Sequence, residues 1–493
     1  MSTSAAAGFV QGVSDKQEVA RVPLPREAIL PWWVIAGYPV LWLLGLAVLF
    51  WPLLLLRVCL IRRPRHVPPG LLMAITFLLA VSLVVAVAMG ETAPGRALSA
   101  VYNIVIWQFL VVALSTKWTV QDLKQVIRGV IALATLQGVV VFVAVWTYPR
   151  GSGIRPLLSY LLPASAVSDP STQSFFVNNL AFADYYSGPV LRTSGFFGHP
   201  NWGAGLAGIA VILVVGAFPG WRSDNRGRLV ALRTAQLLAC AVPLQYAYSR
   251  TTVVAVVFSL GVGAVVALCT RTRRRTWLPI ISAGLVATTI KGLTTDWTAV
   301  YEKFNAPRLG SLLSRSEVYR RTWDVIVDRP VTVLGVGTKE RINGLAASLG
   351  THSSYLGLVY RAGWVAAAAF VVLIVTLFLV AVYRGQWLAV ALISFVGLWS
   401  AAEDFDVGHL MPLGLLMSYL LVNLVSERRP HSGIDVRYGK LILGSVLTDP
   451  PADAANQSES AAATRRDPSP SASPTAQTAQ KSAGMTRGTQ VRP

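Results

Sequence analysis

Long apolar stretches recur along this chain, and each approaches the ~20 residues that a helix needs to cross a bilayer. Their hydrophobic residues form continuous blocks and do not alternate with polar residues at a helical or strand period. Only 13% of the residues are charged and 54% are hydrophobic, and this composition is not that of a soluble globular protein. The pattern predicts an all-α polytopic membrane protein of about 11–12 transmembrane helices. The stretches are 34–60, 69–89, 97–115, 127–147, 203–219, 228–248, 250–270, 277–292, 355–383, 387–402 and 407–426.

The charge distribution predicts how these helices are oriented. The net charge of +20 comes largely from basic runs at the ends of apolar stretches. Such runs belong on the cytoplasmic side of a membrane, so the charge gives no reason to expect nucleic acid as a partner. The resulting topology places two long loops, 148–202 and 293–354, on the outer face. The basic runs are 62–65, 222–228, 271–275 and 428–429.

Three parts are expected along the chain: a polar N-terminal tail (1–30), a transmembrane domain (31–426) and a cytoplasmic tail (427–493). The last part is rich in Ala, Ser, Pro and Thr without an apolar period, which is typical of disorder. The first apolar stretch leaves the helix count open. One span gives about eleven crossings with the N-terminus outside, whereas two short passes broken near Gly45 or Pro52 give about twelve with both ends inside. We favour two passes.

A single histidine stands where the second outer loop meets an apolar stretch. Ionisable side chains at such places are costly, which makes them candidates for function. His352 is followed by Ser353 and Ser354, whose hydroxyls can cap the free backbone N–H groups of a helix start. The positive end of the helix dipole disfavours an imidazolium, so we expect a neutral ring that can accept a proton. The alternative is an interfacial histidine that anchors the helix end.

Basic side chains also gather at the outer face, where membrane orientation gives no reason for them. Arg192 precedes an apolar stretch, Arg250 joins two stretches, and Arg315 and Arg321 lie in the second outer loop. A guanidinium in apolar surroundings needs an anion, and its planar fork suits phosphate oxygens. The alternatives are contact of Arg250 with lipid headgroups, pairing of Arg192 with Asp184 or a lipid phosphate, and simple solvation of the loop arginines.

The second outer loop contains a predicted amphipathic helix. Ser314 and Glu317 have the spacing of a capping box, and apolar residues from Val318 to Ile326 recur on one helical face. Pro330 is expected to end the helix. We expect this helix to lie on the outer membrane surface.

Three blocks on the predicted outer side resemble the O-antigen ligase and polymerase superfamily. RTSGFFGHPNWGAG (192–205) is similar to the family's Arg–Gly–Phe–Pro-Asn loop before a helix. YSRTT (248–252) is similar to its Ser-Arg at the outer start of a core helix. The third block joins RRTWDVIVDRPVTVLGVG (320–337) to THSSYLGLVYRAGWVAAAAF (351–370). It resembles the family's Arg/Trp helix, Pro, Gly-Val-Gly and His–Tyr-Leu–Gly signature.

A ligase pattern within the third block is met at His352, Ser353 and Gly363. It departs at the last position, where Ala366 stands in place of Gly, Thr or Tyr. Polymerases share much of this block, so ligase and polymerase both stay open. The resemblance covers residues from roughly 69 to 425 and implies a GT-C-like membrane fold.

The resemblance implies a membrane glycosyltransferase of surface polysaccharide biosynthesis. Such an enzyme moves a glycan from undecaprenyl or another polyprenyl diphosphate to an acceptor hydroxyl, outside the cytoplasmic (inner) membrane. His352 would be the general base, Arg192 and Arg250 would hold the diphosphate, and Arg315 and Arg321 would be lesser candidates for the same work. The transfer would invert the anomeric centre without a metal or cofactor. Other residues of the matched motifs are expected in the substrate loops: Pro200, Asn201, Ser249, Ser353, Tyr355 and Gly363.

Several other functions remain alternatives. A lipid-linked glycan transporter would be expected to show inverted repeats and charges near the bilayer midplane, whereas here the ionisable groups gather at one face. A metal-dependent sugar transferase would use the D-x-D triplet of Asp404 and Asp406, although two oxygen ligands alone make a weak metal site. A protein O-oligosaccharyltransferase would differ only in its acceptor, and a non-catalytic scaffold is also possible.

Overall fold

The structure is a computed structural model that describes residues 28–61, 70–147, 156–163, 182–183, 192–217, 226–271, 309–329, 334–340, 342, 345, 347–404 and 410–424. By its internal contacts the chain separates into two units, Met1–Leu447 and Thr448–Pro493, and every described residue lies in the first. Nearly all of the predicted tails and the whole of the apolar stretch 277–292 lie outside the described residues. The predicted part boundaries at 30 and 427 therefore stay predictions.

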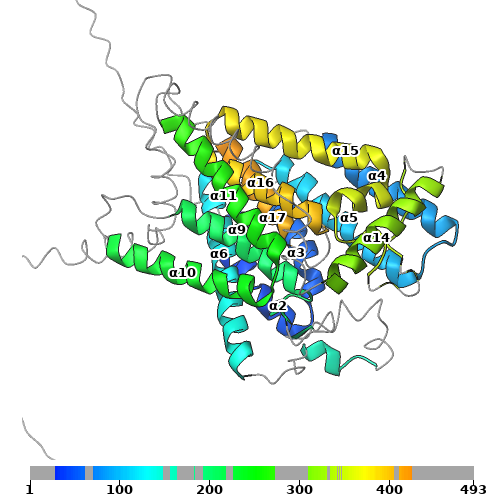
Figure 1. The fold of residues 1–493 in the computed structure, drawn as a ribbon, viewed down its shortest axis with the longest axis horizontal. Coiled ribbons are helices and arrows are strands. Elements are labelled where there is room, and N and C mark those ends of the chain that lie inside the picture. Colours follow the sequence, from blue (N-terminus) through cyan, green and yellow to red (C-terminus); the bar gives the residue numbers. More distant parts are fainter. Residues whose placement is uncertain are drawn as a thin grey trace, which may run out of the picture. The chain divides into compact units, whose positions relative to one another are not determined.

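Helices make up most of the described chain (Figure 1), which confirms the predicted all-α polytopic membrane class. Among the described residues, six helices are long and apolar enough to cross a bilayer. They are α4 (Gly70–Ala88), α5 (Pro94–Ser115), α6 (Val120–Thr147), α10 (Arg226–Tyr246), α11 (Arg250–Arg271) and α15 (Ser354–Tyr383).

Shorter elements complete the described part of the fold, and the count of 11–12 crossings stays a prediction. The apolar ones are α1 (Trp32–Ala36), α2 (Tyr38–Leu44), η1 (Ala47–Leu49), α3 (Phe50–Ile61), α9 (Pro200–Gly216), α16 (Trp387–Ala402) and α17 (Met411–Leu424). Outside this set are η2 (Leu157–Tyr160), α14 (Leu309–Asp328) and the short strands β1 (Phe182–Ala183) and β2 (Arg192–Thr193). The two strands pair antiparallel, with Phe182 opposite Thr193.

The first apolar stretch is broken, as its sequence predicts. Helix α2 ends at Gly45, which adopts a left-handed conformation with a φ of 79°. Glycine takes this conformation without the steric cost that a Cβ would bring, and it commonly ends helices in this way. Pro52 lies in the first turn of α3, where proline is tolerated. The break near Gly45 is therefore confirmed.

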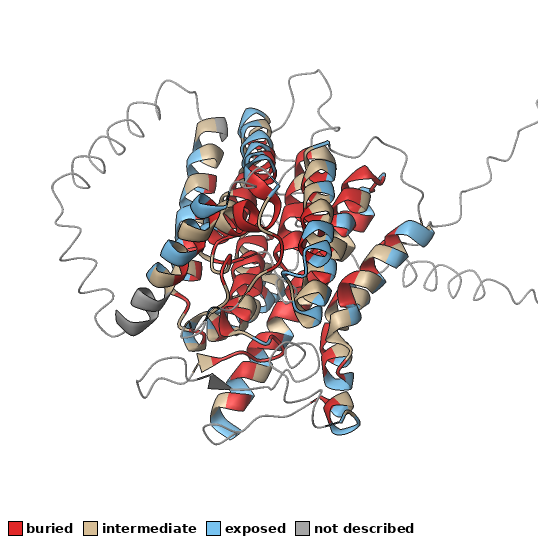
Figure 2. Ribbon diagram, turned by 90° about the vertical axis from the view of Figure 1, so that its right-hand side faces the viewer, coloured by how far each residue is buried: buried red, intermediate tan, exposed pale blue. Residues whose placement is uncertain are grey.

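Helix α16 lies at the centre of the helix packing. It contacts α9, α11, α15 and α17, and Figure 2 shows buried residues running through the middle of the helices while exposed residues lie on outward faces. Most side chains from Leu388 to Val396 are fully buried. Because α16 ends at Ala402, the next two residues, Glu403 and Asp404, emerge from the core of the fold.

Helix α15 is kinked at Gly363, which has a non-helical φ of 81° and ψ of 176°. A kink at this residue frees the carbonyl of Tyr360, the normal partner of the N–H four residues later. The freed carbonyl accepts a hydrogen bond from the backbone N–H of Val336 at 2.5 Å. The approach is so close that a Cβ on Gly335 would lie 2.5 Å from the backbone of Arg361 and Ala362. The Gly-Val-Gly segment is thereby fixed against α15.

Helix α14 differs from its prediction at its start, and part of its apolar face packs against the protein. It begins at Leu309, so Ser314 lies inside the helix and the predicted capping box at its start is wrong. Its apolar face is also turned toward the protein, because Val318 and Ile326 are buried and α14 contacts α15. Packing against the protein therefore accounts for Val318 and Ile326, whereas Trp323 and Val327 are exposed and the position of the helix at the membrane surface stays a prediction.

Candidate active site

His352 lies immediately before α15, with a left-handed φ of 63°. This conformation is uncommon for any residue with a Cβ and is often found where function imposes it. The hydroxyl of Tyr319 on α14 donates to the backbone carbonyl of His352 at 2.6 Å. Ser353 then caps α15, accepting from the N–H of Leu356 at 3.3 Å, which confirms the predicted cap. The histidine is thus fixed between two helices.

The surroundings of His352 keep its imidazole neutral. The pKa of His352 is lowered from 6.5 to about 4, with burial as the largest cause; the positive charges of Arg315 and Lys339 act in the same direction, and Asp404 opposes them. A low dielectric and nearby like charges both disfavour the protonated ring. The predicted proton-accepting form is therefore the form present at neutral pH.

Glu403 joins three other helices to the end of α16 through its carboxylate and its backbone carbonyl. It accepts a hydrogen bond from the side-chain amide of Asn201 at the start of α9, and it pairs with Arg315 of α14 at 2.9 Å. Its backbone carbonyl accepts from the N–H and hydroxyl of Ser354, at 3.0 and 2.8 Å, at the start of α15. Burial raises the pKa of Glu403, and Arg315 opposes that shift. Glu403 therefore connects the starts of α9 and α15 and the body of α14 at one point.

Asp404 forms ion pairs with two further basic side chains, next to the contacts of Glu403. Arg361, inside α15, donates to both of its carboxylate oxygens, at 2.9 and 2.7 Å, and Lys339 forms an ion pair with the same carboxylate. The Arg361 and Asp404 side chains are each only 5% exposed. The Asp404 carboxylate, which the D-x-D alternative would use as a metal ligand, is thus already paired with two cations. Asp406, the other acid of that triplet, lies outside the described residues. Within the described ranges, no three His, Cys, Asp or Glu residues are grouped as a metal site.

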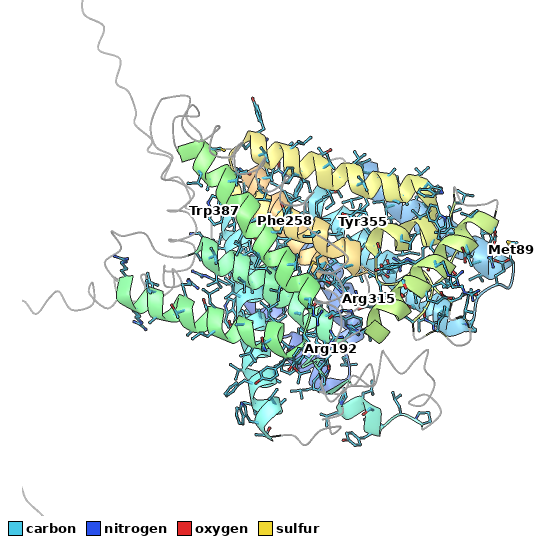
Figure 3. The ribbon with its side chains drawn as sticks, in the orientation of Figure 1. Met89, Arg192, Phe258, Arg315, Tyr355 and Trp387 are labelled. Carbon is cyan, nitrogen blue, oxygen red and sulfur yellow. The ribbon has the colours of Figure 1, made fainter. Side chains whose placement is uncertain are left out.

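Arg192 reaches the same region from β2. Its Nε donates to the backbone carbonyl of Ala247 at 2.6 Å, and its Nη2 donates to the side-chain oxygen of Asn201. Ala247 follows the end of α10 and is separated by only two residues from Arg250, the first residue of α11. The two predicted diphosphate-binding arginines therefore come from segments that meet. Figure 3 shows Arg192 and Arg315 as sticks; it also labels Trp387, the first residue of α16, at the end of that helix opposite Glu403.

A side chain of α6 forms hydrogen bonds with the loop that follows Arg192. The side chain of Gln137 donates to the carbonyl of Ser194 at 3.0 Å and accepts from the N–H of Phe196 at 3.1 Å. Gln137 is 1% exposed, so both bonds lie away from water. The sequence signal for this role is a glutamine in the middle of an apolar stretch, because a buried side-chain amide needs hydrogen-bond partners.

The structure brings together several of the predicted site residues, but not all of them. Asn201 and Arg315 contact Glu403, Arg192 reaches it through Asn201, and His352 lies within the electrostatic influence of Asp404. Ser353 follows His352 as the cap of α15. Arg321 does not join them, because it is half exposed on α14 and pairs with Glu317 at 2.8 Å.

Four other predicted residues lie within helices or at their starts, where they cap, bond or kink the helix. Pro200 is the first residue of α9, and Ser249 shares a hydrogen bond with Thr252 at 2.7 Å in the first turn of α11. Tyr355 donates to the carbonyl of Gly397 at 2.9 Å, and Gly363 forms the kink of α15. Sequence reasoning missed Arg361, although an arginine within an apolar helix calls for a buried carboxylate partner.

Comparison with known families agrees with this arrangement. The family model for O-antigen ligase matches residues 235–371, a range that includes Arg250, Arg315 and His352 but not Arg192. No curated protein and no solved structure matches the chain significantly. With the helical membrane fold, the family match supports a membrane enzyme of glycan transfer in surface polysaccharide biosynthesis. Residues 235–371 of this chain are therefore similar to the O-antigen ligase family.

Proposed function

We propose that this protein transfers a glycan from polyprenyl diphosphate to an acceptor hydroxyl at the outer face of the cytoplasmic membrane. The observation that carries the proposal is a buried, neutral histidine between α14 and the start of α15 and beside Arg315 and Lys339. A neutral imidazole accepts a proton, and the surrounding cations favour an anionic ligand. Both features suit an acceptor hydroxyl and a diphosphate leaving group.

In the proposed reaction, His352 takes the proton of the acceptor hydroxyl as its oxygen attacks the anomeric carbon. The new glycosidic bond forms on the face opposite the leaving group, so the anomeric centre is inverted. The bond between the anomeric carbon and the phosphate oxygen breaks, and polyprenyl diphosphate leaves with its electron pair. Arg192 and Arg250 stabilise the charge that develops on the diphosphate, with Arg315 as the next candidate. Positioned proton transfer contributes ~10²–10⁴-fold, so the arginines supply much of the remaining acceleration.

Donor binding is expected to activate the base. In the free protein, Arg315 and Lys339 oppose a proton on His352. The negative diphosphate offsets these positive charges, which raises the pKa of His352 toward neutrality. A base is most effective when its pKa lies near the working pH. His352 is therefore a better base after the donor is bound than before.

The proposal is tested by transfer in proteoliposomes that contain purified protein and polyprenyl-diphosphate glycan from the native membrane. We expect release of polyprenyl diphosphate with the wild-type protein, and release slower by about 10²–10⁴-fold with His352→Asn. A chelator should leave the wild-type release unchanged. Asparagine is chosen because it tolerates the left-handed φ of this position better than alanine. Movement of intact glycolipid across the bilayer without diphosphate release would contradict the proposal and support a transporter.

A further inference from the structure

Arg233 is a buried arginine away from the candidate active site. It lies on α10, at the end of the fold that the basic runs assign to the cytoplasm. Its position is about 20 Å along the helix from Ala247, the residue that accepts from Arg192, and about 10 Å from the helix start at Arg226. Its side chain is only 3% exposed. An arginine at this depth in a membrane helix needs an explanation.

The contacts of Arg233 leave its charge without compensation among the described residues. Its Nη1 donates at 2.6 Å to the side-chain oxygen of Gln236, a neutral amide. Its Nε is buried and has no hydrogen-bond partner in the described part of the chain. The nearby charge is that of Arg128 on α6, which is also positive. Two cations in partly apolar surroundings repel each other, and an anion between them removes that cost.

The packing of α6 against α10 fixes the separation of these two arginines. The helices approach so closely that a Cβ on Gly138 would lie 2.0 Å from the backbone carbonyl oxygen of Ala239. The two helices therefore cannot move apart to relieve the repulsion without losing this contact. The guanidinium edge of Arg233 is held in place before any ligand arrives.

We propose that Arg233 and Arg128 bind the phosphate of an anionic phospholipid from the cytoplasmic leaflet. The unpartnered Nε of Arg233 supplies a donor for a phosphate oxygen, and the planar guanidinium suits that group. The depth of the site matches a lipid headgroup at the membrane boundary, where basic pockets between helices take acidic headgroups. A free phosphate ion offers the same chemistry and is distinguished below.

Lipid bound here would also support the outer site. Helix α6 holds the Arg192 loop through Gln137, and α10 holds Arg192 through Ala247. A ligand that bridges the cytoplasmic halves of the two helices stabilises the pair that carries this loop. The site itself does not depend on the proposed transfer reaction, because it lies near the opposite membrane face.

The test measures lipid retention and thermal stability of the full chain in neutral detergent. Native mass spectrometry would count phosphatidylglycerol bound to the wild type, to Arg233→Gln and to the control Arg228→Gln, which removes an exposed charge from the same helix. We expect the wild type and the control to retain phosphatidylglycerol in preference to phosphatidylcholine, and Arg233→Gln to lose that preference. Melting temperature should rise with phosphatidylglycerol in the wild type and the control only.

The change in melting temperature without acidic lipid provides a second test. Removing one of two repelling charges should raise the melting temperature of Arg233→Gln in the absence of acidic lipid, and Arg128→Gln serves in its place if that variant does not fold. Equal phosphatidylglycerol retention by Arg233→Gln and the wild type would overturn the proposal. Equal stabilisation of the wild type by inorganic phosphate alone would also overturn it, since the site would then hold a free ion.

Discussion

At the scale of single residues, the site depends on how burial and charge set the state of His352. Burial is the larger cause of its lowered pKa, and Arg315 and Lys339 add to it. The helix dipole that the sequence suggests acts in the same direction, because it disfavours a positive ring at a helix start. His352 is therefore neutral before the donor binds, and its later proton affinity depends on the diphosphate.

This electrostatic arrangement predicts a pH dependence with a definite sign. Because the pKa of His352 lies near 4 and below its usual 6.5, the free enzyme should keep its basic form as the pH falls well below 6.5. The acid limb of kcat/KM, which reports the free enzyme, should therefore lie below 6.5. The acid limb of kcat should lie at higher pH, because the bound diphosphate raises the pKa. Initial-rate profiles would show both, and coincident limbs would contradict the coupling.

The buried pair of Arg361 and Asp404 predicts strongly coupled mutations. Removing one partner leaves an unpaired buried charge, which typically costs roughly 3–5 kcal/mol. Arg361→Gln and Asp404→Asn should each lower the free energy of unfolding in detergent, and the double variant should cost less than their sum. Additive losses would contradict the ion pair. Arg320→Gln is the control, because its partner Glu317 is exposed on α14 and its loss should change stability little.

At the scale of elements, α15 combines the site with a kink. The non-helical backbone at Gly363 frees the Tyr360 carbonyl for Val336, so one glycine connects the Gly-Val-Gly segment to the helix that begins beside His352. The same segment leads to Lys339, which pairs with Asp404. The position of the charges around His352 therefore depends on the shape of α15.

Gly363→Ala should disturb both stability and activity. A φ of 81° with a ψ of 176° is essentially restricted to glycine, and imposing it on another residue costs about 1–3 kcal/mol. We expect a lower melting temperature and slower transfer, because the start of α15 moves when the kink straightens. Gly261→Ala in α11 is a matched control, since a Cβ there meets nothing within 4 Å. A variant at Gly363 with the stability and rate of the control would refute this account of the kink.

At the scale of the whole molecule, local patterns predicted the helices and several site positions. Apolar blocks, the break at Gly45, the Ser353 cap and a histidine at a helix start are all encoded within a few residues. The Glu403 and Asp404 contacts were not predictable in this way, because their partners come from distant segments such as Asn201 and Arg315. The packing of Val318 and Ile326 of α14 against the protein was not predictable for a related reason: an apolar period shows that one face of a helix is buried, but not which partner buries it.

The central claim is that His352 performs the proton transfer while the arginines bind the donor. It is tested most directly by measuring donor binding and single-turnover transfer separately for the wild type and His352→Asn. The account predicts unchanged affinity for polyprenyl-diphosphate glycan and transfer slower by about 10²–10⁴-fold, the usual contribution of a positioned base. Transfer at the wild-type rate, or a loss of rate explained entirely by lost donor binding, would contradict it.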